Sequence, residues 1–125
     1  MDLKTLVHTW FEKWESGDFE HIPITDDFKH TSPYGTIEGK ETYMDLIRAN
    51  RDKFLGHTFE LHDELYSEDV ACVRYTTRNG DFTLQVSEWY YIGAQKHLIK
   101  EIVAYYNIEG EISEERKLNN LDQLQ

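Results

Sequence analysis

The residues best suited to acid–base chemistry are Glu88, Glu101 and His30, and each lies in a segment whose pattern predicts a β-strand. Glu88 alternates with Val86 and Tyr90, so its side chain is expected to point inward. A carboxyl group among apolar walls has a raised pKa and can act as an acid or as a hydrogen-bond donor. The alternative is a glutamate at the end of a strand that reaches solvent.

Glu101 has the same expected inward parity, because it alternates with Ile99 on the next strand. Two carboxyl groups on adjacent antiparallel strands could share a proton, which would make one the acid and the other the base. The alternative is that Lys100 or Arg74 forms an ion pair with one of them.

His30 shares a strand face with Phe28 and Ser32. Because a free imidazole has a pKa of about 6.5, His30 is the best general base that the sequence offers. The alternative is a core histidine bonded to a backbone carbonyl. The six histidines include no pair spaced to share a metal ion, so neither a metal nor a cofactor is expected.

A set of large side chains is predicted to line a pocket around these groups. A buried phenol needs a hydrogen-bond partner, so several tyrosines around one cavity suggest recognition of a polar ligand atom. Ordinary core packing is the alternative, above all for Trp14. With Ser32, the predicted ligand-binding residues are Trp10, Trp14, Met44, Tyr75, Tyr90, Val103 and Tyr105.

The elements that must position these residues follow a simple order. Apolar residues at three- and four-residue steps predict a helix over residues 3–16 and a second over residues 39–55. Alternating patterns predict strands over residues 24–32, 59–66, 70–78, 82–92 and 96–108. The expected fold is α+β, a curved antiparallel sheet wrapped around N-terminal helices to form a cone with one pocket. This domain would span residues 1–110, with a polar tail over residues 111–125.

Composition excludes several classes of partner. The 125 residues carry 13 basic and 24 acidic side chains, a net charge of -11, which argues against nucleic acids and anionic membranes. No apolar run approaches the ~20 residues of a membrane-spanning helix. The single Cys72 excludes an intrachain disulfide, and the N-terminus lacks the apolar stretch of a signal peptide, so a cytoplasmic protein is expected.

The outer face of the sheet is expected to carry an apolar strip that no helix remains to cover. Exposed strips of this kind are typical of protein interfaces. The sequence therefore predicts a homodimer formed through Trp89, Tyr91, Ile102, Ala104 and Tyr106.

Short motifs in a fixed order indicate a family resemblance. They are Trp14–Phe19, Thr25–Phe28, Ser32–Gly35, Gly39–Glu41 and Tyr105–Asn107. In this order the chain resembles the nuclear-transport-factor-2-like superfamily of cone-shaped domains, and within it the SnoaL-like polyketide cyclase and ketosteroid isomerase branch. The resemblance covers residues 2–108.

The resemblance implies site residues only in part. Ser32 stands where ketosteroid isomerases have their general-base aspartate, and Trp10 stands where they have the oxyanion-hole tyrosine. Glu88 aligns with their second oxyanion donor, a protonated carboxylic acid. The machinery of a ketosteroid isomerase is therefore not intact.

The expected function is that of a SnoaL-like, cofactor-free acid–base enzyme of isomerase, cyclase or dehydratase type, acting on a small apolar carbonyl compound. His30 would take a proton, Glu88 would donate to the developing oxyanion, and Glu101 would tune the pair. Two alternatives remain: a non-catalytic domain that binds a small ligand in the same cone, and an interaction module that uses the open sheet face.

Overall fold

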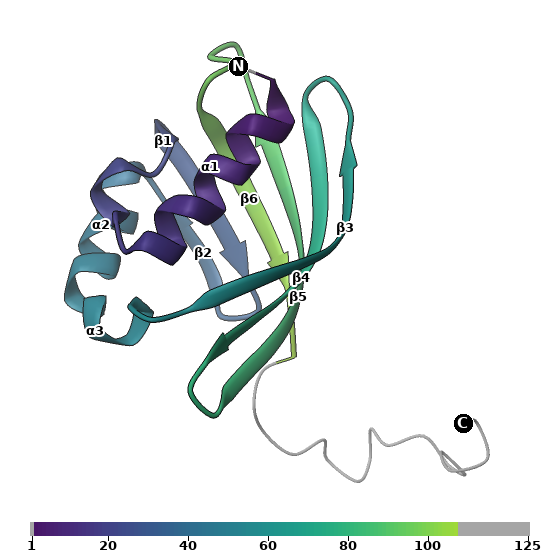
Figure 1. Ribbon diagram of the computed structural model, residues 1–125. Helices are drawn as coiled ribbons and strands as arrows, with labels where there is room; N and C mark the ends of the chain where they lie inside the picture. Colours follow the sequence, from purple (N-terminus) through teal and green to yellow (C-terminus); the bar gives the residue numbers. More distant parts are fainter. Residues whose placement is uncertain (1, 108–125) are drawn as a thin grey trace, which may run out of the picture.

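A helix and a curved sheet face each other across the interior of the protein (Figure 1). The computed structural model describes residues 2–107; the predicted tail, residues 111–125, lies outside them. Helix α1 (Leu3–Ser16) begins at Asp2, whose Oδ1 accepts a hydrogen bond from the Thr5 amide at 2.8 Å. It ends at Gly17, where φ is +81°, a left-handed conformation that favours glycine.

The sheet has six strands in the order β2-β1-β6-β5-β4-β3. All neighbours are antiparallel except β1 and β6, which are parallel, and within residues 2–107 the edge strands are β2 and β3. The strands are β1 (Ile24–Ser32), β2 (Gly35–Glu38), β3 (Thr58–Tyr66), β4 (Val70–Asn79), β5 (Phe82–Ile92) and β6 (Ile99–Tyr105).

The helices cover one face of this sheet. Helix α1 packs against β3 and β4, whereas α2 (Lys40–Ala49) packs against β1 and β2. Short helical turns, η1 (Phe19–His21) and α3 (Arg51–Phe54), flank them. The core between the two layers contains the fully buried side chains Leu6, Val7, Phe19, Phe28, Ile47, Val73, Tyr90, Ile99 and Ile102. None of the described helices is both long and apolar enough to cross a membrane.

Two local features differ from the sequence prediction. Strand β2 was not predicted, because its four residues are too few to show a period. The predicted helix over residues 39–55 is interrupted at Asn50, which has φ -121° and whose Nδ2 donates to the carbonyl of Leu46 at 2.9 Å. A side chain that bonds to its own helix in this way competes with the regular ladder.

The prediction of which β6 side chains point inward is wrong from Glu101 onward. Tyr91 pairs with Glu101 but Ile92 pairs with Ile99, so Lys100 is an extra residue, a β-bulge. One extra residue moves every later side chain to the other face. As a result Ile102 and Ala104 are buried inside, and Glu101, Val103 and Tyr105 lie on the outer face.

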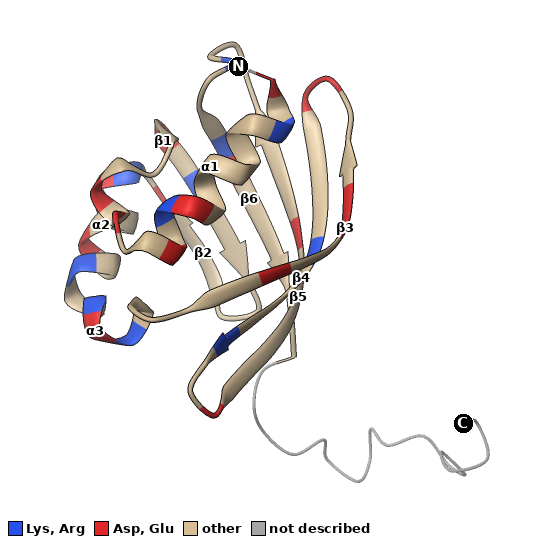
Figure 2. Cartoon of the chain, viewed as in Figure 1, with Lys and Arg blue, Asp and Glu red and all other residues tan. Residues whose placement is uncertain are grey.

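The outer face, which no described helix covers, matches the prediction only in part. Trp89 and Tyr91 lie on it as predicted, whereas Ile102, Ala104 and Tyr106 point to the interior. Leu65 of β3, Trp89 of β5 and Tyr105 of β6 are 71%, 40% and 61% exposed. Trp89 pairs with Cys72 on one side and Val103 on the other, which continues the apolar surface across three strands. Figure 2 shows charged residues along the helices and at turns, whereas most of β5 and β6 is uncharged.

Candidate functional site

A cavity of about 600 Å³ lies between the helices and the concave face of the sheet. Its wall is largely aromatic and aliphatic, with a few polar groups, which is the usual composition of a small-molecule site. The helices contribute Trp10, Trp14, Tyr43, Leu46, Ile47 and Phe54. The sheet and its loops contribute His30, Ser32, Tyr34, Ile37, His57, Phe59, Tyr75, Thr77, Phe82, Leu84, Val86, Glu88, Ala104, Tyr106 and Asn107.

Glu88 is the buried acid in this wall, only 4% exposed. Its Oε2 accepts a hydrogen bond from the Tyr75 hydroxyl at 3.1 Å, and its Oε1 accepts one from the Tyr90 hydroxyl. Burial raises the pKa of Glu88 to about 7. Hydrogen bonds from Tyr90, Tyr75 and the Trp10 indole act in the opposite direction, and the contribution of Trp10 is the smallest. Near neutral pH the group is therefore present both as the acid and as the carboxylate.

Three buried phenols surround this carboxyl. Burial raises the pKa of Tyr75, Tyr90 and Tyr43 well above the ordinary tyrosine value, and the nearby charge of Glu88 adds to the effect. They therefore remain protonated and can donate hydrogen bonds at any physiological pH. Tyr75 faces the cavity, whereas Tyr90 is fully buried outside the cavity wall and lies next to Glu88 on the same face of β5.

His30 lies in the same wall and on the same sheet face as Glu88. Its ring stacks on Tyr43, with 5.2 Å between centroids. Burial lowers the pKa of His30 to about 4, so the imidazole is neutral at physiological pH. His30 pairs with Ile102 and Glu88 with Ala104, both on β6. The two backbone positions are therefore two strand spacings apart across the sheet and two residues apart along it, about 12 Å in all. A small molecule can lie between them.

The structure brings together some of the predicted site residues and separates others. Trp10, Trp14, Ser32 and Tyr75 join Glu88 and His30 in the cavity wall. Met44 is buried in the core, outside that wall, and so is Tyr90. The predicted positions of Glu101, Val103 and Tyr105 are wrong, since the bulge in β6 turns all three outward; Glu101 approaches Lys29, with 3.5 Å between Oε2 and Nζ.

Several residues of the wall were missed. Tyr106 was predicted on the outer face because the bulge does not show in the sequence, and Tyr43, His57 and Thr77 were not among the predicted site residues. His57 lies just before β3, and Thr77 lies near the end of β4. Of these four residues, Thr77 was indicated by the sequence, because it continues the inward alternation of Val73 and Tyr75 along β4.

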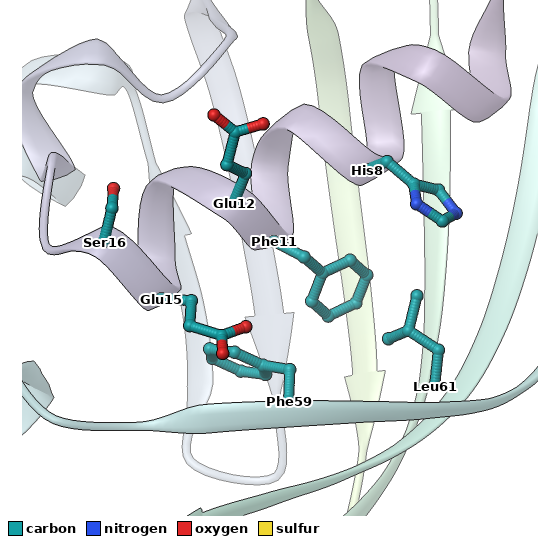
Figure 3. A pocket seen from close by; sticks show the side chains of 7 residues that line it. All are labelled: His8, Phe11, Glu12, Glu15, Ser16, Phe59 and Leu61. Carbon is teal, nitrogen blue, oxygen red and sulfur yellow. The ribbon is translucent and has the colours of Figure 1, made fainter.

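A second hollow of about 500 Å³ lies on the surface between α1 and β3 (Figure 3). Phe11, Phe59 and Leu61 form its floor, and Glu12 and Glu15 stand at its edge. The ring of Phe11 packs edge-on against Tyr75, with 5.0 Å between centroids, and so stands between this groove and the main cavity. Neither Glu12 nor Glu15 is buried, so the main cavity is the better candidate for a functional site.

The histidines are dispersed rather than clustered. His8 Nε2 lies 2.5 Å from Glu64 Oε1. His57 Nδ1 lies 3.0 Å from Thr77 Oγ1, and His62 Nε2 lies 2.7 Å from Thr76 Oγ1. Among residues 2–107, no three histidine, cysteine, aspartate or glutamate side chains converge as ligands for a metal ion would.

Similar structures share this architecture at low sequence identity. An NTF2-like protein from Cytophaga hutchinsonii superposes with a TM-score of 0.70 at 19% identity, covering 83% of this chain and 88% of that one. A protein from Kribbella flavida assigned as a ketosteroid isomerase gives 0.69 at 15% identity, covering 87% and 80%. SalBIII, an epoxide hydrolase/cyclase-like enzyme of pyran ring formation in the polyether salinomycin, gives 0.70 at 13%, covering 84% and 90%.

At these identities the structures establish the fold alone, and they confirm the predicted α+β cone. No curated protein matches the chain significantly. The family comparison is more direct, because the SnoaL-like domain matches residues 7–102, most of the chain. The predicted resemblance is confirmed: the chain belongs to the SnoaL-like domain family.

Proposed function

We propose that the protein is a cofactor-free acid–base enzyme that transfers a proton next to the carbonyl of a small, mostly apolar compound. The observation that carries the proposal is Glu88, a carboxyl with a pKa of about 7 buried in the wall of an aromatic cavity. A group with this pKa is protonated often enough at neutral pH to donate, and its conjugate base is stable enough to form. The structural neighbour from Kribbella flavida that is assigned as a ketosteroid isomerase supports this class of chemistry.

The proposed step keeps the charge of the cavity constant. A ring nitrogen of His30 takes a proton from the carbon next to the carbonyl, and the C–H electron pair forms a carbon–carbon double bond. The carbonyl oxygen takes the proton of Glu88, so the products are an enol, an imidazolium and a carboxylate. Return of a proton to another carbon isomerises the substrate. Alternatively, the enol carbon attacks a second carbonyl carbon of the substrate and closes a ring; the oxygen of that carbonyl takes the proton of the imidazolium, and the enol O–H proton returns to Glu88.

The acidities of the two groups permit this exchange. With pKa values of about 7 for Glu88 and about 4 for His30, the ion pair lies about 4 kcal/mol above the neutral pair before their mutual attraction is counted. That is small beside the barrier of roughly 13–17 kcal/mol that corresponds to ordinary turnover numbers. The single hydroxyl proton of Tyr75 is donated to Glu88, so this phenol stabilises the carboxylate that Glu88 becomes when it gives up its proton.

Enolisation can be tested without knowledge of the substrate. The bicyclic ketone 2-tetralone is incubated in D₂O, and exchange of its α-protons is followed by ¹H NMR. The wild-type protein should accelerate exchange above the buffer rate, and Glu88→Gln and His30→Phe should each lower the acceleration by about 100-fold. Glu101→Gln, the same change on the outer sheet face, is the matched control and should leave exchange unchanged.

The second candidate is a non-catalytic domain that binds a small ligand. One observation favours it: both carboxyl oxygens of Glu88 already accept hydrogen bonds from Tyr75 and Tyr90, so the group is satisfied without a substrate. Saturable binding of 2-tetralone with exchange no faster than in buffer would contradict the enzyme proposal and support this one.

A further inference from the structure

His57 is a polar group of the cavity wall that the proposed chemistry does not use. Its Nδ1 lies 3.0 Å from the Thr77 hydroxyl oxygen, and that hydroxyl donates to the backbone carbonyl of Thr58 at 3.0 Å. Thr77 is buried, and both residues line the cavity or lie directly behind its surface. The chain of contacts therefore runs from the backbone of β3 through Thr77 to the imidazole.

This chain of contacts defines the tautomer of His57. A threonine hydroxyl has one proton, and the proton of Thr77 is used in the bond to the Thr58 carbonyl. For the contact with His57 to be a hydrogen bond as well, Nδ1 must carry the proton and donate it. The other nitrogen, Nε2, is then an acceptor with a free lone pair.

Aromatic neighbours hold the imidazole in place. Phe59 lies nearly parallel to it, with 6.4 Å between centroids, and Phe82 meets it edge-on at 5.8 Å. Within residues 2–107, the ring forms no other hydrogen bond than the one with Thr77. His57 is half-buried and lines the cavity, so Nε2 is an acceptor that the described residues leave without a partner.

His57 and Glu88 lie toward opposite ends of the cavity. Glu88 pairs with Val73 on β4, and Thr77 lies four residues further along the same strand. At a rise of about 3.3 Å per residue, this corresponds to about 13 Å along the sheet. The wall between the two positions is contributed by Tyr75, Val86 and Leu84, which offer a mainly apolar surface.

We propose that His57 Nε2 accepts a hydrogen bond from a hydroxyl group of the ligand, at the end remote from the carbonyl. The ligand class is then an elongated apolar molecule with a carbonyl at one end and a hydroxyl at the other. The carbonyl end rests on the function proposed above for Glu88, whereas the hydroxyl end rests only on the His57–Thr77–Thr58 contacts. His57 is a specificity-determining residue in this scheme and takes no part in proton transfer.

A pair of probes that differ in one hydroxyl tests the proposal. Binding of 4-(4-hydroxyphenyl)cyclohexanone and of 4-phenylcyclohexanone is measured by titration calorimetry at the same pH. The wild-type protein should prefer the hydroxylated probe by about 3- to 10-fold, the range of one net hydrogen bond. His57→Phe should abolish this preference. His62→Phe is the matched control, because His62 makes the same kind of bond to Thr76 but lies on the outer face, and it should retain the preference.

A second measurement needs no variant. Long-range ¹H–¹⁵N NMR spectra of the wild-type protein should show His57 as the Nδ1-protonated tautomer. The proposal is overturned if Nε2 carries the proton, if His57→Phe keeps the preference, or if the wild-type protein shows none, including the case in which neither probe binds. A hydroxyl preference together with no α-proton exchange would leave this inference standing while the proposed enzyme activity fails.

Discussion

Replacing Glu88 with glutamine should change how the stability of the protein depends on pH. Glutamine has nearly the same shape as a protonated glutamate and can bond to both Tyr75 and Tyr90, but it cannot ionise. The variant therefore isolates the effect of one buried charge. Below pH 4.5 the two proteins should have similar stability, because Glu88 is then protonated in both the folded and the unfolded wild-type chain.

The sign and size of the effect follow from the pKa values. The pKa of Glu88 is about 7 in the folded protein against 4.5 ordinarily, so the unfolded chain loses this proton first as the pH rises. Ionisation of the unfolded state then destabilises the folded one progressively from pH 4.5, and the effect levels off above pH 7. At about 1.4 kcal/mol per pH unit, the loss in wild-type stability amounts to about 3 kcal/mol.

The assay is urea denaturation at a series of pH values from 4 to 8.5, read by tryptophan fluorescence. Many carboxylates and histidines titrate over this range, so the informative quantity is the difference between the Glu88→Gln and wild-type unfolding free energies at each pH. This difference should grow by about 3 kcal/mol in favour of the variant. Glu101→Gln should follow the wild-type curve in this respect. A difference for Glu88→Gln that stays constant with pH would refute the raised pKa, and with it the role of Glu88 as an acid at neutral pH.

Two further predictions concern the bulge in β6 and the end of α1. We expect homodimers that form through the outer face, and Trp89→Ser should weaken self-association by at least about tenfold in sedimentation. Ile102→Asp should instead prevent folding, because it places a charge in the core. A wild-type monomer at micromolar concentration would exclude this interface. Gly17→Ala should lower the free energy of unfolding by about 1–2 kcal/mol, because φ is +81° and the new Cβ would lie 2.9 Å from Leu55 Cδ2; unchanged urea denaturation would contradict it.

The fold could be predicted because the apolar patterns of its helices and strands extend over many residues. The stripe of α1 and the alternation of β4 and β5 each extend over ten or more residues, and the inward orientation of Glu88 followed directly from Val86 and Tyr90. His30 was placed correctly for the same reason, since β1 keeps strict alternation from Phe28 to Ser32.

The wrong side-chain orientations in β6 come from a β-bulge, and β3 contains a second one. Lys100 in β6 and His62 in β3 each add one unpaired residue, after which inward and outward positions exchange. Alternation in the sequence continues through a bulge without a visible break, so Glu101 was assigned inward and Ile102 outward. Neither position carries a glycine or proline that would have indicated the irregularity.

The carboxyl of Glu88 is itself an argument for function over packing. Its ionisation costs about 3 kcal/mol at neutral pH, a large part of the 5–15 kcal/mol by which domains are stable. Glutamine at this position would keep the hydrogen bonds with Tyr75 and Tyr90 without that cost. A domain that only needed a filled core or a neutral hydrogen-bonding wall would gain stability from the exchange. A titrating carboxyl in the wall of the cavity is useful where a proton has to be given and recovered, which is the chemistry proposed here.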